Sequence, residues 1–405
     1  MAGPERRAGG PGAPAPRRIG VVTTSRADYG IYRPLLRGIL AEPGLELLLI
    51  VSGMHLCPRF GLTVTEIEAE GLPIAARVET LLEGDTPLDV AGSLGLAVGR
   101  LAPVLHQLGP DLLLVLGDRF EMFAAACAAA PLKLPLAHLH GGELTQGALD
   151  DAFRHAMTKL SHLHFVATRE YAHRVTQMGE EPWRVTVSGA LGLVNLEAIK
   201  PLDRAALEAR LGLALEPAPL LVTFHPETLA AATPLDQAEE LLAALAGQAR
   251  PLVFSLPNAD AGGVALARRF KEFVAARPGA VIGDNLGTQA YFSLMDISAA
   301  MVGNSSSGII EAPSFKLPVV NIGTRQDGRL RAANVIDVPC QRQDIAQGLE
   351  RACSPAFRQG LDNLVNPYWR PDPVGAILGR LKAVDLGPGL INKRFHDLAP
   401  EEEQP

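Results

Sequence analysis

The chain has 405 residues, of which 47% are hydrophobic and 20% charged, so it can form about two folded domains and is too apolar for wholesale disorder. The net charge of −7 and the aromatic content of 5% argue against a general nucleic-acid-binding protein. The four cysteines form no CxxC pair, which predicts reduced thiols and no cysteine-rich zinc site. Residues 1–17 lack the apolar region of a signal peptide, and no apolar run approaches the length of a membrane span. We therefore expect a cytoplasmic protein with a disordered segment before residue 18.

Strands and helices alternate in the first half of the chain. Short apolar runs predict buried strands at 19–23, 45–51, 111–116, 134–139, 164–167 and 185–187. Helices are predicted at 29–41, 120–130 and 151–161. This alternation is typical of a parallel sheet with crossover helices.

The proline-containing stretch 200–219 predicts a domain boundary, after which the alternation begins again. Strands are expected at 220–224, 252–255, 299–302 and 317–322, and a last helix at 373–384. The sequence thus predicts an α/β protein with two Rossmann-like, doubly wound domains, residues 18–198 and 199–385, facing a cleft. The last helix can pack back on the first domain, and residues 386–405 form a tail. Because open α/β sheets bind ligands beyond the carboxyl ends of their strands, the cleft is the expected site.

Charged residues follow the first and third of these strands in the first domain. Arg26 would direct a guanidinium into the cleft, although it could instead pair with Asp28 at the surface. Asp118 and Arg119 combine a carboxylate with a guanidinium, which suits acid–base chemistry beside an anion. The alternative for Asp118 is that it caps the helix that follows.

The next strand end carries two imidazoles and a carboxylate. His138 and His140 are two residues apart, a spacing that places both side chains on one face of a strand, and Glu143 follows two glycines. Two histidines can bind a metal, but the sequence offers no clear third ligand, so we expect no metal site. Asp150 is either a second acid–base carboxylate or a helix cap.

The second domain shows an anion-binding pattern. His225 ends a strand, and the small-residue loop Gly303–Ser307 opens a short helix whose N–H groups and hydroxyls suit a phosphate. Glu311 lies one turn further and could accept hydrogen bonds from the vicinal hydroxyls of a ribose. Together with the carboxylates of the first domain, this pattern fits a sugar nucleotide whose diphosphate lies in the second domain.

At this point the chain resembles the hydrolysing UDP-N-acetylglucosamine 2-epimerases of sialic-acid and legionaminic-acid synthesis. The resemblance runs from about Ile19 to about Leu381. It is carried by the ordered blocks SRADYG (25–30), SGMH (52–55), LGDR (116–119), HLHGGE (138–143), RHAMTK (154–159), HPET (225–228), GNSSSGIIE (303–311) and GTRQ (323–326). The HGGE block and Val335–Pro339 are most similar to the bacterial branch.

The resemblance implies a GT-B fold, release of UDP and inversion at C2, which gives a free manno-configured sugar, without a metal or nicotinamide cofactor. It implies nucleotide binding by Arg26, Arg119, His225, Asn258, Ser305, Ser306, Glu311 and Arg325. It implies acid–base roles for Asp118 and Asp150. The animal enzymes have a glutamate where this chain has His140, so either His140 or Glu143 would take over an acid–base or positioning role.

Several alternatives remain open at this level. A non-hydrolysing epimerase, a GT-B glycosyltransferase and a catalytically inactive UDP-sugar sensor would use the same cleft. The residues that read C4 and C6 of the sugar cannot be identified, so UDP-N-acetylglucosamine and UDP-2,4-diacetamido-2,4,6-trideoxyglucose are both candidate substrates. The family resemblance suggests a homodimer or homotetramer.

Overall fold

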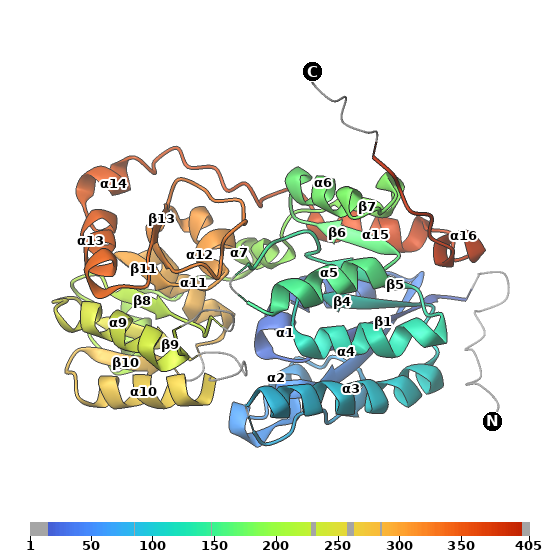
Figure 1. The fold of residues 1–405 in the computed structure, drawn as a ribbon, viewed down its shortest axis with the longest axis horizontal. Coiled ribbons are helices and arrows are strands. Elements are labelled where there is room, and N and C mark those ends of the chain that lie inside the picture. The colour runs from blue at the N-terminus through green and yellow to red at the C-terminus, as the bar shows by residue number, and fades with distance from the viewer. Residues whose placement is uncertain are drawn as a thin grey trace.

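The computed structural model describes residues 15–84, 86–146, 148–227, 232–256, 263–283 and 286–398. Two parallel β-sheets form its framework (Figure 1). The strands of the first are β1 (Arg17–Thr23), β2 (Leu45–Ser52), β3 (Ile74–Val78), β4 (Leu112–Leu116), β5 (Leu136–Leu139), β6 (Leu163–Val166) and β7 (Val185–Val187). Those of the second are β8 (Leu220–Thr223), β9 (Leu252–Ser255), β10 (Ala280–Gly283), β11 (Ala300–Gly303), β12 (Val319–Ile322) and β13 (Val335–Val338).

The two sheets have the same strand order over six strands, and β7 extends the first sheet at one edge. The first runs β3-β2-β1-β4-β5-β6-β7 and the second β10-β9-β8-β11-β12-β13. Ile19 of β1, for example, pairs with Leu47 on one side and Leu112 on the other. The direction of winding therefore reverses between β1 and β4 and again between β8 and β11, and such switch points leave a crevice at the carboxyl ends of the strands. The predicted pair of doubly wound α/β domains is confirmed.

Helices lie on both faces of each sheet (Figure 1). In the first domain they are α1 (Arg26–Ala41), α2 (Val64–Ala69), α3 (Pro87–Leu108), α4 (Phe120–Ala129), α5 (Asp150–Leu160), α6 (Arg169–Gln177) and α7 (Val194–Ala198). In the second they are α8 (Arg204–Leu211), α9 (Pro234–Ala246), α10 (Gly263–Ala275), α11 (Gly287–Ile297), α12 (Ser307–Ile310), α13 (Arg342–Ala352) and α14 (Pro355–Gln359), and these are followed by α15 (Pro373–Ala383) and α16 (Pro388–Ile391). Each sheet is buried against its own hydrophobic core.

The chain returns to the first domain at its end. Ile377 and Leu381 of α15 are buried in the core of the first domain, where α15 packs against α1. Beyond α16, the ammonium of Lys393 lies 2.7 Å from the buried carboxylate of Glu180. Because α7 contacts α1 whereas α8 contacts α11, we propose that the domain boundary lies between these two short helices.

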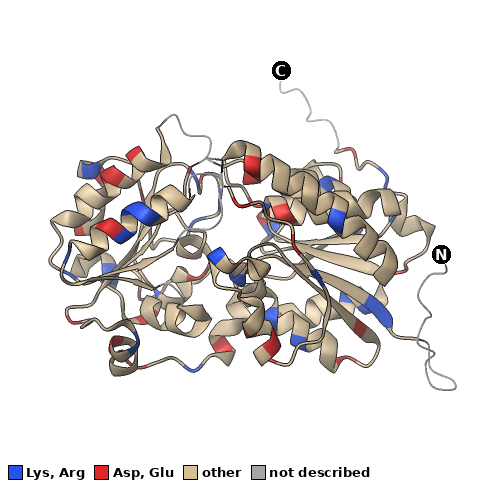
Figure 2. Ribbon diagram, turned by 90° about the horizontal axis from the view of Figure 1, so that it is seen from below, with Lys and Arg blue, Asp and Glu red and all other residues tan. Residues whose placement is uncertain are grey.

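Helix α3 is long and apolar enough, by length and composition, to cross a membrane, which the sequence analysis did not anticipate. In this fold α3 packs against α4, and it buries Ser93, Ala97, Leu101 and Leu105, which are spaced by four residues and share one face. Lys/Arg and Asp/Glu positions are distributed over both domains (Figure 2).

Candidate active site

A cleft of about 990 Å³ lies between the two domains, and both switch points open into it. Its walls include the segments that follow β1, β4 and β5 in the first domain and β8, β11 and β12 in the second. The strand-end residues that the sequence predicted for the site therefore come together in one place, except Asn258, which lies outside the described residues.

The first switch-point segment presents Arg26 to the cleft. Helix α1 begins there because Ser25 and Asp28 form a capping box. Asp28 accepts hydrogen bonds from the N–H groups of Thr24 and Ser25, at 3.1 and 3.0 Å. Its carboxylate thus fixes the turn, and the alternative of a surface Arg26–Asp28 pair is not what the structure shows.

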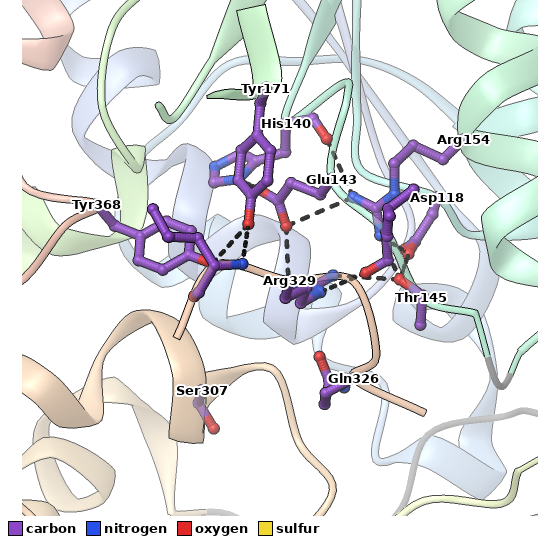
Figure 3. Close-up of polar contacts among 12 residues, drawn as sticks. Asp118, His140, Glu143, Thr145, Arg154, Tyr171, Ser307, Gln326, Arg329 and Tyr368 are labelled. Carbon is purple, nitrogen blue, oxygen red and sulfur yellow. Dashed lines mark hydrogen bonds and ion pairs between the residues drawn. The ribbon is translucent and has the colours of Figure 1, made fainter. Parts of the chain in front are cut away.

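Asp118 is part of a charged cluster. Its Oδ2 accepts hydrogen bonds from Arg154 of α5 and, at 3.3 Å, from the hydroxyl of Thr145 (Figure 3). Burial raises the pKa of Asp118, but Arg154, Arg329 and Arg325 outweigh burial and lower it overall. Asp118 does not cap α4, whose N-cap is Arg119.

Arg119 lines the cleft beside Asp118, and its guanidinium is held from the side. Its Nη2 lies 2.9 Å from the buried carboxylate of Glu121 and 3.8 Å from the sulfur of Met54. These contacts hold the guanidinium in the wall of the cleft.

Glu143 and His140 form a second cluster after β5. His140 has a φ of +63° and lines the cleft, with its Nδ1 2.7 Å from Glu143 Oε1 (Figure 3). Glu143 is fully buried, and Arg154 Nη1 lies 3.6 Å from its Oε2. Burial raises the pKa of Glu143, but Arg329 and the hydrogen bond from His140 outweigh it and lower the pKa to about 2.

The two histidines of the HLH block have different roles in the structure. His138 is fully buried, with Nε2 2.8 Å from the carbonyl oxygen of Gly117 and Nδ1 3.2 Å from the hydroxyl of Thr158. Burial lowers its pKa to about 3. His138 and His140 therefore do not act as a pair, and no group of three metal-ligating side chains occurs among the described residues.

Asp150 lies in the first turn of α5 and lines the cleft. The neighbouring carboxylate, Asp151, stabilises the local backbone instead, because its Oδ1 accepts a hydrogen bond of 2.6 Å from the N–H of Thr145. Asp150 therefore lies beside the ligand space.

In the second domain, close backbone contact shapes the anion loop. Gly303 has a φ of +140°, and a Cβ there would lie 1.9 Å from the carbonyl oxygen of Thr223, so this position requires glycine. Asn304 accepts a hydrogen bond of 2.7 Å from the N–H of His225 and donates to its carbonyl oxygen at 2.9 Å. The loops after β8 and β11 are thereby joined, and His225 lines the cleft.

Hydroxyl groups line part of this half of the cleft. The Ser307 hydroxyl lies 2.9 Å from that of Ser305 and 2.7 Å from that of Tyr291 on α11. Tyr291 is also 3.3 Å from the hydroxyl of Thr223. Ser305, Ser306 and Ser307 all line the cleft, so the predicted anion loop contributes neutral donors to it.

Glu311 and Arg325 complete the second-domain wall. Glu311 Oε2 is buried without a hydrogen-bond partner among the described residues, and burial raises the pKa of Glu311 to about 7. Arg325 is positioned by Glu227, whose Oε1 accepts from the N–H groups of Thr324 and Arg325 at 2.9 and 3.1 Å.

Sequence reasoning missed Arg329. It belongs to the second domain, yet its Nη1 lies 3.0 Å from Glu143 Oε2 and its Nε donates to the Leu144 carbonyl oxygen at 2.8 Å (Figure 3). Its place three residues after the GTRQ block was the available signal. Arg154 and Thr145 were likewise not assigned to the site, because their partners come from other strand ends.

A family model described as UDP-N-acetylglucosamine 2-epimerase matches residues 37–382. The chain belongs to this family. It is 39% identical over 385 residues to the GDP/UDP-N,N'-diacetylbacillosamine 2-epimerase (hydrolyzing) of Campylobacter jejuni, which covers 94% of this chain and 99% of the relative. The identity is 35% to the polysialic acid biosynthesis protein P7 of Escherichia coli, with 94% and 98% covered.

A third relative is the UDP-N,N'-diacetylbacillosamine 2-epimerase (hydrolyzing) of Legionella pneumophila, at 36% identity, with 83% of this chain and 89% of the relative covered. Among solved structures, the putative UDP-N-acetylglucosamine 2-epimerase of Listeria monocytogenes has a TM-score of 0.76 at 16% identity, with 91% of this chain and 96% of the other covered. The likeness to this epimerase confirms the predicted fold class.

Proposed function

We propose that the protein is a hydrolysing UDP-sugar 2-epimerase. It converts a UDP-2-acetamido sugar and water into UDP and the free sugar that is inverted at C2. The observation that carries the proposal is that two chemically different clusters of side chains, one from each domain, face the same cleft. The first domain presents ionised carboxylates with an imidazole, and the second presents hydroxyls, an imidazole and a guanidinium.

The second domain would hold the nucleotide. Arg325, His225 and the hydroxyls of the Ser305–Ser307 loop suit a diphosphate, with Arg26 and Arg119 facing it from the first domain. Glu311 would accept hydrogen bonds from the ribose hydroxyls. We include Asn258 among the proposed nucleotide-binding residues on the basis of the family resemblance alone. These donors stabilise the charge that develops on UDP as the C1–O bond breaks.

The first domain would move protons. The C2–H bond is not acidic in the substrate, but it becomes acidic as C1 loses its leaving group. Removal of that proton gives a 2-acetamidoglucal, water then adds at C1, and C2 receives a proton on its other face. Asp118, His140, Glu143 and Asp150 are the acid–base candidates, and such a group contributes roughly 10²–10⁴ in rate.

The names of the relatives guide the choice of substrate. Of the three relatives described above, the two that are more than 35% identical are both named as hydrolysing enzymes for N,N'-diacetylbacillosamine nucleotides. We therefore propose UDP-N,N'-diacetylbacillosamine first and UDP-N-acetylglucosamine second. The manno-configured product would serve cytoplasmic nonulosonic-acid synthesis, in agreement with the name of the Escherichia coli relative. We further propose that the enzyme acts as a homodimer or homotetramer.

Proton NMR of the purified enzyme in D₂O, with each UDP-sugar offered separately, tests the proposal. We expect free UDP and a manno sugar deuterated at C2, and the faster reaction names the substrate. A deuterated UDP-manno sugar without free UDP would instead establish a non-hydrolysing epimerase. Absence of any reaction with either sugar would contradict the proposal and favour a glycosyltransferase or a binding protein.

A further inference from the structure

The four acid–base candidates differ in the hydrogen bonds and ion pairs that their side chains already make. Both oxygens of Glu143 are engaged, Oε1 by His140 Nδ1 at 2.7 Å and Oε2 by Arg329 Nη1 at 3.0 Å. The pKa of Glu143 is about 2, because these partners outweigh the effect of burial. A carboxylate so far from neutrality is a poor proton carrier near pH 7. Glu143 is therefore an ionised acceptor whose partner is His140.

His140 differs from Glu143 because only one of its two ring nitrogens has a hydrogen-bond partner among the described residues. A carboxylate only accepts hydrogen bonds, so the nitrogen that faces Glu143, Nδ1, carries the hydrogen. The other nitrogen, Nε2, is buried and has no hydrogen-bond partner in the part of the chain that the structure describes. Since His140 also lines the cleft and its Nδ1 is held by Glu143, Nε2 is the ring nitrogen that is left for a ligand.

The backbone fixes this imidazole in place. The N–H of His140 donates to the carbonyl oxygen of Phe165 at 2.9 Å, and its carbonyl oxygen accepts from Arg154 Nη1 at 3.0 Å. A φ of +63° is uncommon for a residue with a Cβ and persists only where the surroundings enforce it. The backbone that carries the ring is thus fixed on both sides.

Arg329 reaches this pair from the other domain. Its guanidinium also lies 3.3 Å from the Thr145 hydroxyl, and its side chain is buried. The adjacent backbone is anchored on both sides: the Leu330 N–H donates to the Tyr171 hydroxyl at 3.0 Å, and the Leu330 carbonyl oxygen accepts from Tyr368 at 2.8 Å. Arg329 therefore occupies a fixed position in the assembled cleft.

The loop that carries Arg329 crosses between the domains at close range. Gly328 has a φ of +80°, and a Cβ there would lie 2.3 Å from the Leu144 side chain. The Arg329–Glu143 contact consequently exists only when the two domains are together.

We propose that His140 is the group that takes the proton from C2 and that Arg329 is a positioning residue, which holds Glu143 ionised and so sets the tautomer and orientation of His140. This assignment rests on the proposed function. In the step, the C2 proton goes to His140 Nε2, the C–H electron pair forms the C1=C2 bond, and the C1–O pair leaves with UDP. Water then bonds through its oxygen to C1, the proton of this water passes by way of Asp150 to C2 on the opposite face, and His140 releases its proton to solvent.

The charged and titratable groups around His140 come from several elements. They are Glu143 on the same loop, His138 of β5, Asp118 after β4, Arg154 of α5, Tyr171 of α6 and Arg329 of the second domain. Loss of one cation from this set favours binding of a proton to the His140–Glu143 pair. The pair must be unprotonated at Nε2 to act as a base, so this loss moves the acidic limb of the activity profile to higher pH.

The test is the pH profile of kcat/KM for release of UDP by the full-length enzyme. We expect Arg329→Gln to lower kcat roughly 10- to 100-fold, about what misplacement of a reacting group costs, and to move the acidic limb upward by about 0.5 to 1 pH unit. Arg329→Lys keeps the charge and should restore the position of the limb. His140→Gln should lower kcat by roughly 10²–10⁴ and remove the limb, with UDP affinity retained.

Arg331→Gln is the matched control. Arg331 belongs to the same loop, donates to the Arg329 carbonyl oxygen at 3.1 Å and pairs with Asp337 at 2.8 Å inside the second domain. This variant loosens the loop but leaves the guanidinium at Glu143, so the acidic limb should not move. A lower kcat for Arg329→Gln with an unmoved limb would overturn the positioning role.

A second readout does not depend on the reaction. Long-range ¹H–¹⁵N correlation of the histidine rings, with the His140 signals assigned from His140→Gln, should show the Nδ1–H tautomer in the wild type and its loss in Arg329→Gln. If the wild type releases no UDP but the tautomer still changes between the wild type and Arg329→Gln, the proposed function fails while the Arg329–Glu143–His140 arrangement stands. An unchanged tautomer in Arg329→Gln would refute the arrangement even in an active enzyme.

Discussion

The two walls of the cleft are built from the same topological switch point but with different chemistry. In the first domain, Asp118, Glu143 and Arg154 are ionised and hold one another in place. In the second, Ser305, Ser307 and Tyr291 form a chain of neutral hydroxyls. The contrast teaches that fixed charges suit proton transfer, which needs set protonation states, whereas neutral donors can receive an anion without first losing a charged partner.

The largest effect is expected at Asp118. Asp118→Asn keeps the shape of the side chain but removes a charge from the first wall, so kcat should fall by roughly 10²–10⁴. The dissociation constant of UDP, measured by calorimetry, should change less than about threefold. Asp151→Asn is the control, because Asp151 bonds to the Thr145 N–H and does not line the cleft. Equal losses of binding and turnover in Asp118→Asn would contradict the proposal that the first domain moves protons while the second holds the nucleotide.

Removal of one hydroxyl from the charged wall should reduce stability. The Thr145 hydroxyl accepts from Arg154 at 2.8 Å and lies 3.3 Å from Asp118. Thr145→Val removes one hydrogen bond each from Arg154 and Asp118 while their ion pair remains, and we expect the free energy of unfolding to fall by about 2–3 kcal/mol. Urea denaturation measures the free energy of unfolding. A loss under about 0.5 kcal/mol would show that the charged groups form replacement contacts when the hydroxyl is absent.

Glu311 offers a test by pH. Because burial raises its pKa to about 7, Glu311 is protonated below that pH and ionised above it. The ionised form accepts stronger hydrogen bonds from ribose hydroxyls, so UDP should bind more tightly as the pH rises from 6 to 8. Glu311→Gln should weaken UDP binding about tenfold and abolish this pH dependence. In the free protein the sign is reversed: a raised pKa means that stability from this group falls as the pH rises from about 4.5 towards 7.

The smallest effect is expected in the neutral wall. Tyr291→Phe removes a hydroxyl that bonds to Ser307 at 2.7 Å and Thr223 at 3.3 Å. Since both partners are uncharged, the free energy of unfolding should fall by only about 1 kcal/mol in the same urea assay. A loss as large as that of Thr145→Val would contradict the expected difference in stability between the charged contacts of the first domain and the uncharged contacts of the second.

Much of the fold could be predicted because its central strands are buried on both faces and appear as unbroken apolar runs. The strands β4 and β8 were predicted to within a residue. The edge strands β3 and β10 were missed, because partly exposed strands alternate with polar or small residues and have no such run. Helix α1 was predicted three residues short, since its capping box was taken for a loop.

The site could be predicted where a residue follows its own strand, as Asp118 and His225 do. It could not be predicted where the contact joins distant segments. Arg154 reaches Asp118 across 36 residues, and Arg329 reaches Glu143 from the other domain. Sequence spacing carries no information about such pairs, and the choice between His140 and Glu143 depended on them.

The return of α15 to the first domain makes the second domain an insertion in the chain. Both ends that the structure describes lie on the first domain, at Arg17 of β1 and beyond α16 (Figure 1). A pulling force applied to these two ends is therefore carried by the first domain, while the second domain lies outside the load path. In a single-molecule stretching experiment, the first rupture should detach the C-terminal segment, where Lys393 and α15 hold it.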